Sequence, residues 1–206
     1  VIGKLKAFAG ENGATILIMS DHGHGSLDGK AQPNLLLARW GYLGLRSGLS
    51  RARTRGQVWW RRLLKQRNGT PVGALDHDLA IDWSRTRACV LHAGIYGCLY
   101  LNLKGRQPEG VGIVEPSEYE SLRGEIRARL LSAKCIDERG REMSIFPEVY
   151  TTEELYGCGR DDSPWMPDLL LAPADGLAVV KKIRGHSPVR WVPLSRLEGT
   201  HRVHGV

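Results

Sequence analysis

The sequence predicts an α/β domain in which helices flank a mostly parallel central sheet. Residues 14–20 and 168–172 are short, almost wholly apolar runs, which is typical of strands buried on both faces. Segments with helical periodicity alternate with such runs along the chain, as in layered α/β domains. The first run also leads directly into a polar, glycine-rich turn, the position at which open parallel sheets carry functional residues.

The overall composition is that of a single globular domain. The chain has 206 residues, of which 42% are hydrophobic and 25% are charged. It contains no apolar run long enough to cross a bilayer and no signal-peptide core near its start. The four cysteines form no C-x-x-C pair, so we expect reduced thiols in a cytoplasmic protein. A single disulfide bond between two of them is the remaining alternative.

The first two predicted elements are a helix and a strand. Residues 1–13 place Ile2, Leu5 and Phe8 at helical spacing, and glycines close the segment. Residues 14–20 follow as a strand, since five of the first six are apolar and three are threonine or isoleucine. We therefore expect a central strand that ends at the polar turn.

The remaining predicted elements alternate between helices and short apolar strands. They are a helix over 32–42, strands at 88–91 and 97–103, a helix over 118–132, and strands at 168–172 and 179–184. The helix over 118–132 has the clearest pattern, because Leu122, Ile126, Leu130 and Leu131 form one apolar stripe with charges opposite.

A basic segment interrupts this alternation. The formal net charge is +7, and residues 46–67 contribute eight Lys or Arg with Trp59 and Trp60 among them. Such a mixture binds nucleic acid in some proteins. Without a recognised module we favour a solvated, variable excursion at about 46–73 whose tryptophans pack on the domain, and we expect no nucleic-acid partner.

Two short segments carry candidate metal ligands. Asp21 and His22 follow the predicted first strand, in a turn where Gly23 and Gly25 allow close approach of the backbone. Near the other end, His201 lies in a glycine-flanked turn over 199–205. Taken singly, a capped turn is the favoured explanation of Asp21 and His22, and a surface loop histidine is the favoured explanation of His201.

Together these segments resemble the metal-binding motifs of the alkaline phosphatase superfamily. The segments are Ser20-Asp21-His22-Gly23 and Gly199-Thr200-His201-Arg202. They are most similar to the motifs of the type I phosphodiesterase/nucleotide pyrophosphatase-like phosphohydrolases. Other segments resemble that family in the same order: residues 82–88 (D-W-x-x-T-x-A), 100–110 (N-x-x-G-R-x-P-x-G at its end), 153–156 and 167–169. The resemblance extends over nearly the whole chain.

The resemblance implies a two-metal phosphohydrolase that cleaves phosphodiester or pyrophosphate bonds in a small phosphate-ester substrate. Asp21 and His22 are then the ligands of the ion that activates a Thr or Ser nucleophile. His201 is a ligand of the second ion, which activates water. Imidazole and carboxylate donors favour zinc, with manganese as the alternative.

The chain departs from the family pattern at its N-terminal side. The family's nucleophile and first metal-binding Asp lie before any segment found here, and residues 1–13 contain no Asp or His for the second ion. We therefore expect residues 1–206 to be the C-terminal part of the phosphohydrolase domain, a partial domain with no catalytic residue of its own. The isolated chain should then have little phosphodiesterase activity.

Two further residues are candidates for substrate binding. His24 stands where the family commonly has an aromatic residue. It is an extra metal ligand, a substrate contact or a replacement without a functional role, and we favour the last. Arg106 suits bidentate phosphate binding or a structural role in its turn. His204 and the cluster at 76–78 are expected to be solvent-facing or loop residues.

Other functions remain open beside the leading one. Another superfamily branch, a phosphomutase or a sulfatase, has the same ligand motifs. A non-catalytic protein that binds a partner or an anionic polymer through residues 46–67 is the alternative outside enzymes.

Overall fold

The computed structural model describes residues 1–17, 19–46, 81–106, 112–159, 165–193, 195 and 198–202. Its helices are α1 (Ile2–Glu11), α2 (Pro33–Arg39), α5 (Tyr119–Leu131) and α6 (Thr152–Tyr156), with 3-10 turns at Trp83–Arg85 and Pro116–Glu118. Its strands are β1 (Gly23–Ser26), β2 (Gly29–Ala31), β3 (Ala88–His92), β4 (Gly97–Leu101), β5 (Lys134–Ile136), β6 (Glu142–Ser144), β7 (Glu148–Thr151), β8 (Leu169–Ala172), β9 (Leu177–Val179), β10 (Val189–Trp191) and β11 (Gly199–Arg202). None of the described helices has the length and apolar character needed to span a membrane.

The predicted parallel central sheet is wrong, because the fold is mixed and its sheets are small and mainly antiparallel. The largest sheet has the order β3-β4-β8-β7 and is antiparallel throughout. A second sheet has the order β10-β2-β9, in which β2 and β9 run parallel. Only residues 93–96 connect β3 to β4, which is too short for a parallel crossover, since that takes a dozen or more residues.

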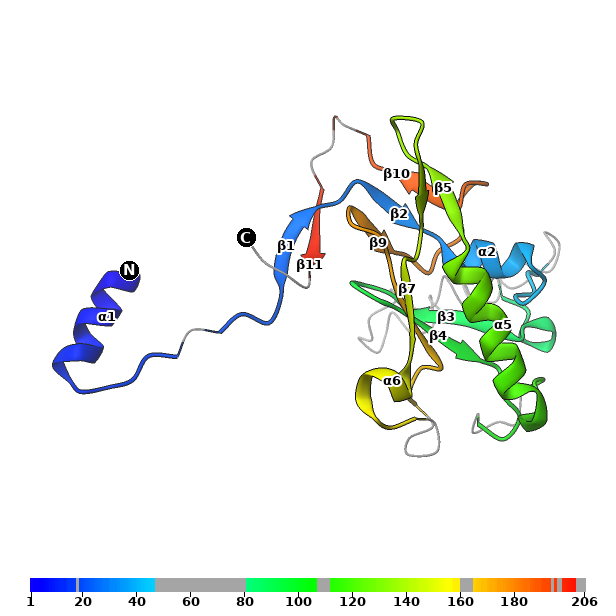
Figure 1. Cartoon of the computed structure of the whole chain (residues 1–206), viewed down its shortest axis with the longest axis horizontal. Helices are drawn as coiled ribbons and strands as arrows, with labels where there is room; N and C mark the ends of the chain where they lie inside the picture. The colour runs from blue at the N-terminus through cyan, green and yellow to red at the C-terminus, as the bar shows by residue number, and fades with distance from the viewer. Residues whose placement is uncertain are drawn as a thin grey trace, which may run out of the picture.

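The core joins the four-stranded sheet to α2 and α5, and it also includes buried residues of the β10-β2-β9 sheet (Figure 1). α2 contacts β3, and α5 contacts β7. The predicted helix over 118–132 is confirmed as α5, which buries Leu122, Ile126 and Leu130 of its stripe while Leu131 stays 41% exposed. The all-apolar β8 confirms the strand predicted at 168–172, and all four of its residues are buried within an antiparallel sheet.

A buried asparagine attaches α2 to the edge of this sheet. The Asn34 side chain donates a hydrogen bond to the Val90 carbonyl at 2.9 Å and accepts one from the Val90 N–H at 2.8 Å. The amide thereby satisfies the backbone groups that a neighbouring strand otherwise pairs. The predicted helix over 32–42 and strands at 88–91 and 97–103 correspond to α2, β3 and β4.

The N-terminal region differs most from expectation. The helix predicted over 1–13 is confirmed as α1, but Ile2, Leu5 and Phe8 are exposed, and Figure 1 shows the helix lying apart from the rest of the molecule. The strand predicted at 14–20 is wrong over the described residues, which have no regular structure; Leu17 is 79% and Met19 78% exposed. An apolar run becomes a strand only where another strand pairs with it.

The C-terminal region also differs from the predicted pattern. The strand expected at 179–184 lies earlier, as β9. Of the turn predicted over 199–205, the described residues 199–202 are instead the strand β11, which pairs antiparallel with β1. This two-stranded sheet brings together segments from opposite ends of the sequence, and both carry the predicted metal ligands.

Candidate metal site

The pairing of β1 with β11 brings together the histidines predicted from sequence. His24 is the direct cross-strand partner of His201. Directly opposed residues of an antiparallel pair project from the same face of the sheet. Their imidazole ring centroids are accordingly 5.2 Å apart, with the rings nearly perpendicular at 85°.

His22 lies just before β1 and joins the same group. Its ring centroid is 3.9 Å from that of His201 and 5.6 Å from that of His24. Three imidazoles from two distant segments therefore lie together. The structure brings His22 next to His201 and adds His24 to the group.

The turn around Asp21 and His22 sets the orientation of the His22 ring. The Ser20 hydroxyl donates to the His22 carbonyl oxygen at 2.8 Å. The ring nitrogen Nδ1 is 3.0 Å from the Gly23 carbonyl oxygen, which only accepts, so the proton is placed on Nδ1. A neutral ring then has its lone pair on Nε2, the arrangement in which a backbone carbonyl commonly orients a metal-binding histidine.

The separation of Asp21 and His22 fits a shared metal ion. Asp21 Oδ2 lies 3.5 Å from His22 Nε2. Two ligand atoms at about 2.0–2.1 Å from a tetrahedral ion lie ~3.4 Å from each other. The Asp21 side chain is 88% exposed and the His22 side chain 29%, so an ion has access from solvent.

The ligands do not form a complete cage. Within the ranges that the structure describes, no group of three or more His, Cys, Asp or Glu residues is arranged to hold a metal ion. The candidate site therefore consists of adjacent donors rather than a complete coordination sphere. The chemistry of these donors and the distances between them support the site.

Arg106, the second candidate for substrate binding, occupies a structural position. Its Nη1 lies 2.6 Å from Asp168 Oδ2, and its guanidinium also donates to the Met166 carbonyl. The guanidinium carbon lies 5.5 Å from the centre of the Tyr100 ring. The Arg106 and Asp168 side chains are only 6% and 1% exposed, which matches the structural alternative considered from sequence.

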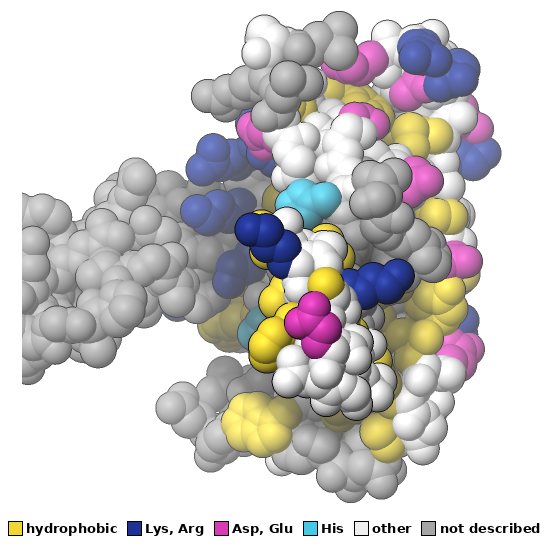
Figure 2. Space-filling view, turned by 90° about the vertical axis from the view of Figure 1, so that its left-hand side faces the viewer, with side chains coloured by type: hydrophobic (Ala, Val, Ile, Leu, Met, Phe, Trp, Pro, Cys, Tyr) yellow, Lys and Arg dark blue, Asp and Glu magenta, His cyan; other side chains and the backbone are white. Residues whose placement is uncertain are grey.

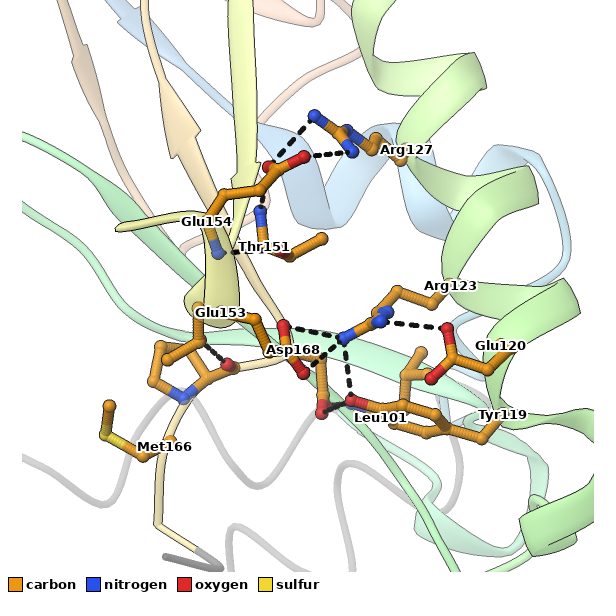
Figure 3. Close-up of polar contacts among 12 residues, drawn as sticks. Leu101, Tyr119, Glu120, Arg123, Arg127, Thr151, Glu153, Glu154, Met166 and Asp168 are labelled. Carbon is orange, nitrogen blue, oxygen red and sulfur yellow. Dashed lines mark hydrogen bonds and ion pairs between the residues drawn. The ribbon is translucent and has the colours of Figure 1, made fainter. Parts of the chain in front are cut away.

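Sequence reasoning missed the polar network around Asp168. This carboxylate also accepts hydrogen bonds from the Leu101 N–H at 2.6 Å and the Tyr119 hydroxyl at 2.7 Å. Figure 3 shows how the network extends from Tyr119 to Arg123, whose guanidinium donates to Glu153. An acidic residue directly before an all-apolar strand is the signal that could have revealed it, because a buried carboxylate needs partners.

Burial and charge in this network act on the Tyr119 hydroxyl. Removal from water raises the pKa of Tyr119, and the Asp168 carboxylate raises it further. The hydroxyl therefore stays protonated and donates to Asp168 across the physiological range. The Asp168 carboxylate at the centre of the network is only 1% exposed, so its role is to stabilise the fold rather than to contact a substrate.

Several candidates from the sequence lie outside the described residues. These are the Arg-rich excursion beyond Arg46, the cluster at 76–78 and His204. The four cysteines are all described, and the structure contains no disulfide bond between them.

Comparison with protein family models, curated proteins and solved structures finds no match. The motifs of the sequence and the geometry of Asp21, His22, His24 and His201 are therefore what bears on function.

Proposed function

We propose that this chain forms the metal-binding part of a phosphohydrolase that cleaves phosphodiester or pyrophosphate bonds with two divalent ions. Zinc is the first choice of metal and manganese the second. The observation that supports the proposal is the 3.9 Å separation of the His22 and His201 rings. These residues come from opposite ends of the sequence, and the resemblance to two-metal phosphohydrolases assigns them to neighbouring ions.

In this proposal, residues of this chain bind the two ions and orient the ligand side chains. Asp21 and His22 hold one ion, and the Gly23 carbonyl keeps the His22 ring turned so that Nε2 meets it. His201 holds the second ion. Bound divalent ions neutralise phosphate charge and activate an oxygen nucleophile, and the proposal assigns that nucleophile to no described residue.

The first prediction concerns the zinc affinity of the chain. Calorimetric titration of the metal-free chain with zinc should show binding, and His22→Ala should weaken it at least about tenfold, because ligand losses exceed the effect of losing an outer partner. His92→Ala is the matched control, since His92 is an exposed histidine at the end of β3. Equal zinc binding by His22→Ala and the wild-type chain would contradict the site.

The substrate class is tested with anions on the same samples. Orthophosphate should bind the zinc-loaded chain and not the metal-free chain, because the ions supply the charge that attracts it. Sulfate serves as the comparison anion. Tighter binding of sulfate than of phosphate would favour the sulfatase branch, and binding of phosphate without zinc would contradict the proposed function.

A further inference from the structure

His24 has a geometric relation to His201 that the proposed function does not use. The two residues are direct partners in the β1–β11 ladder, and both side chains are exposed. Their ring centroids lie 5.2 Å apart at an interplanar angle of 85°. A metal ion in solvent therefore reaches both imidazoles from the same face of a two-stranded sheet.

The distance between these rings fits two imidazoles on one ion. A histidine nitrogen binds zinc at about 2.1 Å, which places the ring centre ~3.2 Å from the metal. Two such rings on a tetrahedral ion have centres ~5 Å apart. The 5.2 Å between His24 and His201 is the nearest to this value, whereas the 3.9 Å between His22 and His201 is too short and the 5.6 Å between His22 and His24 is longer.

The donors therefore divide into two pairs. Asp21 and His22, with Oδ2 and Nε2 at 3.5 Å, fit one ion. His24 and His201 fit the other.

We propose that His24 is a ligand of the metal ion held by His201. The inference depends on the proposed function, and it gives each of the two ions two protein ligands from this chain. Because His24 and His201 lie on different strands, the ion also links β1 to β11. Binding to the paired strands stabilises that pairing, since a metal that binds only the folded form shifts the equilibrium towards it.

The test compares two substitutions at one position. His24→Phe keeps an aromatic ring but removes both donor nitrogens, and His24→Cys keeps a metal donor in place of the imidazole. Zinc titration of the wild-type chain should give two ions per chain. His24→Phe should weaken one of them at least about tenfold, whereas His24→Cys should retain both. His92→Phe is the matched control and should leave both ions in place.

A second readout uses the wild-type chain alone and so is independent of folding in the variants. Imidazole nitrogen NMR shifts of His24 and His201 should change together as the second equivalent of zinc is added. Amide hydrogen exchange of β1 and β11 should slow at the same point, because the ion links the strands.

The outcomes separate the two proposals. If His24→Phe keeps both ions while His22→Ala loses one, His24 is not a ligand and the proposed function stands. The inference also fails if the His24 nitrogens do not respond to zinc, or if His24→Cys loses the ion with β1 and β11 still paired. If the wild-type chain binds no zinc, the proposed function itself fails.

Discussion

At the scale of single residues, Asp168 shows what a buried charge requires. Its carboxylate is almost fully removed from water, and it has partners from three different segments: Arg106, Tyr119 and the Leu101 N–H. Removing one partner of a buried ion pair leaves an uncompensated charge, which costs far more than a surface pair contributes. Arg106 therefore acts on stability, although its position in a turn also suited a phosphate ligand.

We predict that Arg106→Ala lowers the free energy of unfolding by about 3–5 kcal/mol, because it leaves the Asp168 carboxylate buried without its cation. Urea denaturation measures this change. In the control, Asp168→Asn introduced into the Arg106→Ala chain should recover part of the loss, because the unpaired charge is then gone. A loss below about 1 kcal/mol, together with weaker phosphate binding, would instead support the substrate-binding role.

At the scale of elements, α6 illustrates how a very short helix is stabilised at its ends. Five residues form too little helix to be stable alone. A capping box closes its start: the Thr151 hydroxyl accepts from the Glu154 N–H, and the Glu154 carboxylate accepts from the Thr151 N–H. Gly157, with φ +65°, ends it in the left-handed region. Arg127 of α5 adds a bidentate pair to Glu154 (Figure 3).

The hydrogen bond from Thr151 N–H and the Arg127 guanidinium lower the pKa of Glu154. A carboxyl whose pKa is lowered by folding stabilises the fold above its unfolded pKa of about 4.3. That stabilisation is lost as the pH falls through the folded value. We predict that Glu154→Gln lowers the Tm at pH 7, by an amount that corresponds to less than about 1 kcal/mol because the pair is exposed.

The pH dependence is the check on this assignment. The Tm difference between the wild type and Glu154→Gln at pH 7 should shrink towards zero at an acid pH below the folded pKa of Glu154, where the carboxyl is protonated in both the folded and unfolded chains. Thermal unfolding followed by circular dichroism at both pH values measures it. A difference that stays constant with pH would show that the charge of Glu154 does not contribute.

At the scale of the whole molecule, the core and the N-terminal region behave differently. The four-stranded sheet and α5 share one buried core, whereas α1 and the segment after it expose Phe8, Leu17 and Met19. Figure 2 views the side on which α1 lies and shows hydrophobic side chains exposed beside basic ones. Exposed apolar groups of this kind contribute little to stability and favour association.

We predict that replacing both Leu17 and Met19 by Ser changes the free energy of unfolding by no more than about 0.5 kcal/mol, as expected for exposed positions. The same change should reduce light scattering at high protein concentration. Leu99→Ala is the contrasting variant, because Leu99 is fully buried in β4, and it should cost about 2–5 kcal/mol. A loss of several kcal/mol in the double variant would mean that these side chains pack in the folded chain.

The sequence by itself determined the features that depend on near neighbours. The helices over 1–13 and 118–132 follow from local periodicity, and Asp21 and His22 are adjacent through the peptide bond, so the hypothesis that they act together as ligands needs only the motif. Only the tertiary structure decided which strands pair. The run at 14–20 has strand composition, yet its described residues join no sheet, whereas β11 forms because β1 lies beside it.

The candidate site divides in the same way. That His24 faces His201 depends on the register of two strands far apart in sequence, and no local pattern specifies it. The short connection between β3 and β4 likewise made their pairing antiparallel, although the composition of the strands suited a parallel sheet. The physical reason is common to both: helix hydrogen bonds close within one segment, whereas each strand bonds to a partner that the rest of the fold supplies.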